Sequence, residues 1–215
     1  MNSDIVLREK ILAAGRSILE KRLVQGTGGN ISARTAKGFL ITPSGIEYQN
    51  VAPGDLVEMD IEGNVIGGTC VPSVEREMHR LIMASRPDVN AVIHTHSIYA
   101  TSVASARLPL EALTDNQVAV FGGAVPLADY GPIGSLQLAQ NAVRALGSGC
   151  GVLLSNHGSI CTGSTITEAL LRCEMLEAFA RIYILAKIAG GGVPLSAEEI
   201  SYESAFIKEN YGQKK

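Results

Sequence analysis

Apolar residues recur three or four positions apart in six segments of the chain, a spacing that predicts amphipathic helices. The segments are residues 5–23, 73–86, 97 onwards, 136–146, 165–188 and 197 onwards. The second segment opens at Ser73, whose hydroxyl is suited to accept a hydrogen bond from the first turn of a helix. It stops before Pro87, which lacks the N–H that a continuing helix needs.

Short apolar runs bounded by glycine, proline or asparagine predict strands between these helices. The runs are residues 39–41, 56–59, 64–66, 91–96, 151–154 and 159–161, and the glycine- and proline-rich tract 121–134 holds a further strand and a loop. Strands lie between helices, and the chain shows neither an internal repeat nor a linker. The sequence therefore predicts one domain over residues 1–215, of the α/β or α+β class and built in three layers.

The charge balance narrows the range of functions. Eighteen Lys and Arg against 21 Asp and Glu leave a net charge of −3, with no basic run longer than Lys214-Lys215, so we expect no nucleic-acid partner. The hydrophobic content of 46% is that of a folded chain. The longest apolar stretch, residues 175–189, is interrupted by charged side chains, and the first residues do not resemble a secretory leader. We therefore expect a cytoplasmic protein without a membrane span.

Three of the four histidines stand in positions typical of metal ligands. His94 and His96 are two residues apart in a predicted strand, so both imidazoles point to the same face. His157 follows another predicted strand and precedes Gly158, which permits a tight turn beside the ring. Three imidazoles with an open fourth position make up a catalytic zinc site. The alternative interpretation is an ordinary half-exposed strand and an unrelated His157.

Glu75 is a candidate for a carboxylate that joins this site. It lies at the start of the predicted helix before the His-Thr-His strand, where it can bind the metal or act as a base. The alternative is that an acidic residue in a first turn only complements the helix dipole, which is the interpretation that we favour for Glu77. His79 follows Glu75 by four residues and is expected to be structural.

Three short loops combine glycine or proline with hydroxyl and amide side chains. They are residues 26–30, 42–45 and 72–73. Glycine lets backbone N–H groups approach an anion closely, and a helix N-terminus adds a positive dipole. The chain has neither the Walker pattern nor the dinucleotide-binding glycine motif. Each loop alone is typical of an ordinary turn, whereas together they predict an anion pocket.

Five motifs, in this order, resemble the class II aldolase and adducin family over nearly the whole chain. They are Gln25-Gly-Thr-Gly-Gly-Asn-Ile-Ser, Leu40-Ile-Thr-Pro-Ser-Gly, Pro72-Ser-Val-Glu, Val92-Ile-His-Thr-His and Asn156-His-Gly. The branch that they resemble most is that of the L-fuculose-phosphate aldolases. The resemblance implies an α/β/α fold with a mostly antiparallel central sheet, and a homotetramer with active sites at subunit interfaces. It also implies a sugar-phosphate substrate and one divalent metal per chain, Zn²⁺ in the first place and otherwise Mn²⁺ or Co²⁺.

The resemblance further implies roles for individual residues. The metal ligands are His94, His96, His157 and Glu75, and Glu75 is also the catalytic base. The substrate phosphate is bound by Thr27, Asn30, Ser44, Gly45 and Ser73. Tyr211, near the C-terminus, resembles a catalytic tyrosine that reaches the active site of a neighbouring subunit.

Some positions depart from the family pattern. Val74 stands where the family has the second of two serines, so one phosphate-binding hydroxyl is missing. Residues 110–117 contain no match to the aldolases' mid-chain tyrosine, which leaves the general acid unassigned. Ala119 stands where the related epimerases have a catalytic aspartate, and Asp115 is out of register with that position. These two residues argue against that epimerase activity.

We therefore expect a metal-dependent aldehyde-lyase that cleaves a small ketose phosphate, similar to fuculose 1-phosphate, into a triose phosphate and an aldehyde. The metal would act as a Lewis acid that stabilises an enediolate. The same chemistry leaves an epimerase, a decarboxylase or a dehydratase open as alternatives. A non-catalytic, adducin-like interaction module is another alternative, and the presence of the three histidines and Glu75 speaks against it.

Overall fold

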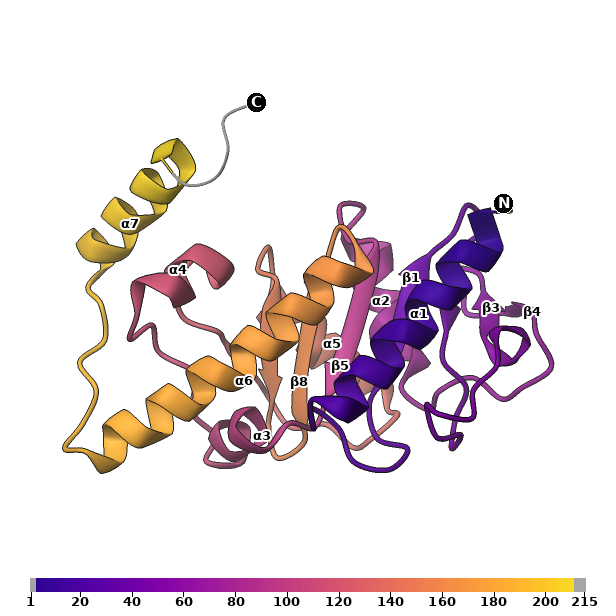
Figure 1. The fold of residues 1–215 in the computed structure, drawn as a ribbon, viewed down its shortest axis with the longest axis horizontal. Helices are drawn as coiled ribbons and strands as arrows, with labels where there is room; N and C mark the ends of the chain where they lie inside the picture. The colour runs from indigo at the N-terminus through magenta and orange to yellow at the C-terminus, as the bar shows by residue number, and fades with distance from the viewer. Residues whose placement is uncertain (1–2, 211–215) are drawn as a thin grey trace.

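The computed structural model describes residues 3–210 and, in that range, contains seven α-helices and eight strands (Figure 1). The helices are α1 (Ser3–Glu20), α2 (Arg76–Ser85), α3 (Ile98–Ser105), α4 (Asp115–Phe121), α5 (Leu136–Leu146), α6 (Ile166–Ile188) and α7 (Ala197–Asn210). The strands are β1 (Asn30–Arg34), β2 (Phe39–Ile41), β3 (Val57–Met59), β4 (Val65–Gly67), β5 (Ala91–Thr95), β6 (Leu127–Ala128), β7 (Gly151–Leu154) and β8 (Gly158–Gly163).

The eight strands of the described range form one sheet in the order β4-β3-β2-β1-β5-β8-β7-β6. Neighbouring strands are antiparallel except for β6 and β7, which run parallel. Strand β5 lies near the centre, where His94 is opposite Asn30 of β1 on one side and Ile160 of β8 on the other. The predicted α/β fold with a mostly antiparallel central sheet is thereby confirmed.

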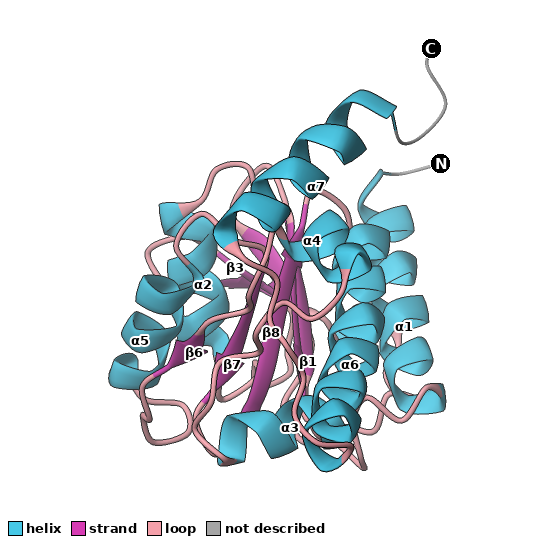
Figure 2. Ribbon diagram, turned by 90° about the vertical axis from the view of Figure 1, so that its left-hand side faces the viewer, coloured by secondary structure: helices cyan, strands magenta, loops and turns pink. Residues whose placement is uncertain are grey.

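Helices cover both faces of the sheet and give the predicted three layers (Figure 2). Helices α1, α3 and α6 lie on one face, and α2 and α5 lie on the other. Successive side chains of β5 alternate between these layers, because side chains along a strand point to opposite faces. Ile93 packs in the core under α6, and Val92 packs in the core under α2 and α5. His94, two residues after Val92, consequently points toward the α2 layer.

Helix α2 begins later than its sequence predicts. We expected Ser73 to cap the helix, but the first helical residue is Arg76 and the capping position is Glu75. The Ser73 hydroxyl instead accepts a hydrogen bond of 3.2 Å from the backbone N–H of Glu75. The N–H of Ser73 donates to the carbonyl of Thr42, at 3.1 Å. This long-range bond to the loop after β2 holds Ser73 outside the helix, and sequence periodicity carries no signal of it.

Helix α4 is absent from the sequence prediction. It has seven residues, which is shorter than the window in which helical periodicity is recognisable. The side chain of Thr114 caps it by accepting a hydrogen bond of 3.3 Å from the N–H of Gln117. Helix α7, which the sequence did predict, packs beside α4 (Figure 1).

The first helix ends at Glu20, three residues before the predicted end. Tyr211, the proposed catalytic tyrosine, lies outside the described residues. Among the helices of residues 3–210, none combines the length and apolar character that crossing a bilayer requires.

Candidate metal centre

The carboxyl end of β5 carries two of the proposed ligands. His94 is fully buried, and His96 follows the last strand residue. The N–H of His96 donates to the carbonyl of Leu23 at 3.0 Å, which holds the chain in place beyond the strand. The Nε2 atoms of the two histidines lie 2.8 Å apart. Their two-residue spacing thus brings both rings to one point, as the sequence predicts.

A tight turn between β7 and β8 brings His157 to the same point. Asn156 adopts the left-handed conformation, with φ of 57°, and Gly158 begins β8. A Cβ atom on Gly158 would lie 2.3 Å from the carbonyl oxygen of Thr95, so only glycine allows this approach to β5. The ring centroids of His157 and His94 are consequently 4.8 Å apart.

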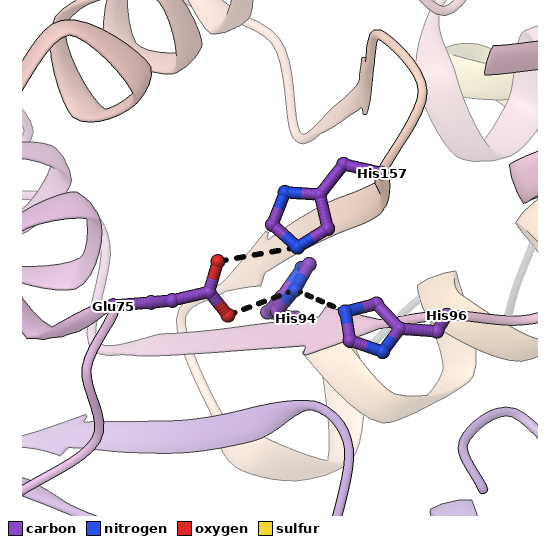
Figure 3. Close-up of side chains that lie close together, drawn as sticks. All are labelled: Glu75, His94, His96 and His157. Atoms are coloured by element: carbon purple, nitrogen blue, oxygen red, sulfur yellow. Dashed lines mark hydrogen bonds and ion pairs between the residues drawn. The ribbon is translucent and has the colours of Figure 1, made fainter. Parts of the chain in front are cut away.

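Glu75 reaches the three imidazoles from the α2 layer, as Figure 3 shows. Its side chain is 3% exposed. Oε2 lies 3.1 Å from Nε2 of His94, and Oε1 lies 3.3 Å from Nε2 of His157. The late start of α2 leaves Glu75 at the capping position, beside the sheet rather than inside the first turn.

The cluster fits a divalent cation. One ligand atom from each of the four side chains lies within 4.8 Å of the others. Among the described residues, Glu75 Oε1 and His157 Nε2 find no hydrogen-bond partner although both are buried, a costly state that a cation relieves. Nδ1–H of His94 donates to the carbonyl of Ser159 at 2.9 Å, which leaves the lone pair of Nε2 facing the cluster. Three imidazole nitrogens and a carboxylate oxygen are ligands that suit zinc.

Burial and mutual attraction set the charges of the four side chains. Burial lowers the pKa of His96 and of His157 to about 4 each, and the nearby His94 adds to the effect. Both are therefore neutral near pH 7, the form in which imidazole binds metals. Burial also opposes charge on His94 and Glu75, but their attraction for each other outweighs it. The pKa of His94 is raised and that of Glu75 is lowered as a result.

Two of the three proposed phosphate loops lie side by side. Pro43 and Pro72 form an isolated bridge, and the N–H of Ser44 donates to the carbonyl of Val71 at 2.9 Å. Ser73 is buried beside Glu75, whereas Gly45 is exposed. The structure thus brings Ser44, Gly45 and Ser73 to the side of the cluster from which Glu75 comes.

The third loop passes beside the histidines. Gly29 has φ of 72°, and a Cβ there would lie 2.6 Å from the carbonyl oxygen of His94. The side chain of Thr27 is exposed. Asn30 is buried, and its amide nitrogen donates to Glu75 Oε2 at 2.9 Å. Its side chain therefore meets the candidate base, a contact that the sequence analysis missed.

His79, which the sequence analysis expects to be structural, lies outside the group of four candidate ligands. Its ring is fully buried and bonds to the hydroxyl of Ser32 at 2.6 Å. The other ring nitrogen bonds to Asn30 Oδ1. The four-residue spacing between Glu75, which caps α2, and His79 was the sequence signal that these two side chains lie on the same side of that helix.

Comparison with known protein families gives a match over most of the chain. Residues 9–184 match the family described as Class II Aldolase and Adducin N-terminal domain. The chain belongs to the class II aldolase and adducin family. The resemblance inferred from the five sequence motifs is thus confirmed, and the four clustered side chains lie within three of those motifs.

Similar proteins include two bacterial aldolases. The chain is 38% identical over 208 residues to the 5-deoxy-D-ribulose 1-phosphate aldolase of Bacillus thuringiensis serovar kurstaki, covering 96% of this chain and 97% of the relative. It is 35% identical over 181 residues to the 5-methylthioribulose-1-phosphate/5-deoxyribulose-1-phosphate aldolase of Rhodospirillum rubrum, covering 84% and 81%.

A solved structure supports the same family. An L-fuculose 1-phosphate aldolase superimposes with a TM-score of 0.91 and 37% identity, over 97% of this chain and 98% of the other. The protein is a class II aldolase, an aldehyde-lyase of the metal-dependent type, with a three-histidine and glutamate site for a divalent metal.

Proposed function

We propose that the protein cleaves a ketose 1-phosphate between C3 and C4, releasing dihydroxyacetone phosphate and an aldehyde. The observation that carries this proposal is the cluster of three imidazoles and the buried Glu75, in which one carboxylate oxygen has no hydrogen-bond partner among the described residues. The names of the relatives, which act on 5-deoxyribulose, 5-methylthioribulose and fuculose 1-phosphates, supply the substrate class.

His94, His96, His157 and Glu75 would hold the metal, for which zinc is the first choice and Mn²⁺ or Co²⁺ the alternative. A divalent metal supplies Lewis-acid stabilisation of the negative charge that develops on the substrate oxygens when the carbon–carbon bond breaks. Glu75 and His94 are buried, which limits the access of bulk water to that charge from their side of the cluster.

Glu75, displaced from the metal by the substrate, would move a proton at the carbon that becomes nucleophilic. In the direction of bond formation, its carboxylate removes a proton from C3 of dihydroxyacetone phosphate, and the electron pair of that C–H bond forms the new carbon–carbon bond. In the direction of cleavage, the carboxylic acid returns the proton to the same carbon. Oε1 is the oxygen that faces the cluster without a hydrogen bond from the described residues.

The loops around Ser44 and Ser73, together with Thr27, Asn30 and Gly45, would bind the phosphate and orient the substrate. Of the two N–H groups on the Asn30 amide, one is engaged by Glu75, so one remains for a phosphate oxygen. The contribution of Asn30 to phosphate binding is therefore at most a single hydrogen bond.

A panel of phosphorylated ketoses tests the proposal. The zinc-loaded protein is incubated with 5-deoxyribulose 1-phosphate, 5-methylthioribulose 1-phosphate, fuculose 1-phosphate and ribulose 5-phosphate, and dihydroxyacetone phosphate is measured with a coupled dehydrogenase. We expect release from at least one of the three 1-phosphates and none from ribulose 5-phosphate. Epimerisation, decarboxylation or dehydration without triose-phosphate release would refute the proposal.

The phosphate group is expected to raise kcat/KM at least about tenfold relative to the unphosphorylated ketose, which corresponds to roughly 1.4 kcal/mol. Equal kcat/KM for ketose and ester would overturn the assignment of the phosphate loops.

Val74 is 49% exposed, so a hydroxyl at this position is accessible to substrate. Val74→Ser should lower KM for the phosphate ester by about 3–10-fold, the effect of one added hydrogen bond. The KM of the unphosphorylated ketose is the control and should not change.

We further propose a homotetramer in which Tyr211 serves the active site of a neighbouring subunit. In bond formation its hydroxyl would protonate the alkoxide of the aldehyde, and Tyr211→Phe should reduce turnover by about 10²-fold or more without loss of metal. Truncation after Ala205 should reduce turnover further. Light scattering reports the assembly of each variant.

Subunit mixing tests whether Tyr211 acts across the interface. Tyr211→Phe subunits and Glu75→Gln subunits should each have low activity alone, but mixed tetramers would contain sites with an intact Glu75 and an intact neighbouring Tyr211. Partial recovery of activity on mixing is the expected result. A fully active truncated protein would show that the tail has no catalytic role.

A further inference from the structure

A line of four buried polar side chains leads from the central sheet to Glu75. The hydroxyl of Ser32 lies 2.6 Å from Nδ1 of His79. Nε2 of His79 bonds to Oδ1 of Asn30, and Nδ2 of Asn30 donates to Glu75 Oε2 at 2.9 Å. None of the four residues is more than 4% exposed. The proposed reaction uses Glu75 and a single N–H of Asn30, and it leaves His79 without a role.

The chemistry of the groups fixes the direction of the two hydrogen bonds that the Asn30 amide makes in this line. A carboxylate only accepts, so the nitrogen of the Asn30 amide faces Glu75 and its oxygen faces His79. An amide oxygen also only accepts, so Nε2 of His79 carries the proton. Burial lowers the pKa of His79 to about 3, so the ring is neutral and its Nδ1 accepts from the hydroxyl of Ser32. Every donor points toward Glu75.

We propose that His79 is a positioning residue for the reaction, which acts through Asn30 to anchor Oε2 of Glu75 and thereby makes Oε1 the oxygen that exchanges the proton. This inference rests on the proposed function, in which Glu75 is the base. A proton on Oε2 would displace the N–H of Asn30, whereas Oε1 accepts one without losing any hydrogen bond to the described residues. Donors aligned in one line also strengthen one another in a buried site.

The hydrogen-bonded sheet holds Ser32 and Asn30, two members of this line, in fixed positions. Ser32 and Asn30 lie two residues apart on β1, so both side chains point to the face of the sheet that α2 covers. Asn30 is opposite His94 in the register of β1 and β5. The strand pair that carries a metal imidazole therefore also carries the group that orients the base, and the relative position of the two is held by sheet hydrogen bonds.

Two amide substitutions at position 79 separate the positioning role from simple filling of space. The amide of glutamine reaches about as far as Nε2 of histidine, so His79→Gln keeps a donor for Asn30. The amide of asparagine reaches only as far as Nδ1, so His79→Asn keeps the bond to Ser32 and loses the donor for Asn30. Both variants lose the ring and thus control for its packing.

We expect His79→Asn to lower kcat by about 10–100-fold, the range for loss of a group that orients a metal ligand. The KM should stay within about twofold, and the metal content should be unchanged because the three imidazoles remain. His79→Gln should recover most of kcat. In the Glu75→Gln background, where no base remains to be oriented, His79→Asn should cause no further loss. Equal losses in both amide variants, or an additive loss in that background, would refute the positioning role.

A measurement on the unaltered enzyme tests the same inference without depending on activity. In protein with ¹⁵N-labelled histidine, His79 should show a proton on Nε2 and none on Nδ1, in both the apo and the zinc-loaded enzyme. His79→Gln identifies the signal by its disappearance. A proton on Nδ1 would reverse the line of donors and overturn the proposal. If the tautomer is as expected and no ketose phosphate is cleaved, the proposed function fails instead.

Discussion

Glu75→Gln is expected to reduce turnover of the best ketose 1-phosphate by a factor of about 10²–10⁴, the range that a general base contributes. Glutamine has nearly the same shape as glutamate but cannot take the proton from carbon. Its amide still has an oxygen at one end, so the hydrogen bond from Asn30 can persist. The loss should appear in kcat, measured by triose-phosphate release, while the three histidines retain part of the metal.

The matched control for this substitution is Glu77→Gln. Glu77 lies two residues further along α2 and pairs with Arg80 at 2.8 Å, away from the histidines. Its replacement removes the same charge from the same helix and should change turnover by less than about twofold, since a partly exposed ion pair contributes little. Similar losses in both variants would show that the effect comes from helix charge. Near-normal turnover of Glu75→Gln would leave Glu75 as a ligand only.

His157→Ala and His94→Ala are expected to empty the metal site and to lower turnover by at least about 10³-fold, because the metal supplies several kcal/mol of charge stabilisation. His157 is the cleaner target, since its side chain is 14% exposed and lies in a turn. His94 is fully buried and donates to the carbonyl of Ser159, so its loss also opens a cavity next to β8.

Elemental analysis after dialysis against a mild chelator measures the result of these two substitutions as metal ions per chain. Far-ultraviolet circular dichroism verifies that each variant remains folded. His79→Asn serves as the control, because it removes the fourth histidine without touching a ligand atom. Unchanged metal in both alanine variants would remove the basis of the proposed mechanism.

The sequence by itself determined the chemistry of the site. The alternation of strand side chains was sufficient to place His94 and His96 on one face, and Gly158 indicated the tight turn beside His157. The order of the five motifs was sufficient for the family, and thus for the α/β/α fold. Long helices such as α6 were predicted to within one residue because their pattern extends over many turns.

Only the tertiary structure decided which side chains meet. The start of α2 depends on a hydrogen bond between Ser73 and the loop after β2, and α4 is too short to leave a periodic pattern. Asn30 and Glu75 are 45 positions apart, and Asn30 and His79 are 49 apart. Such contacts follow from strand register and helix packing, which depend on the whole chain at once. The type of a residue gives the chemistry that its side chain can perform, whereas long-range packing determines which other side chains it contacts.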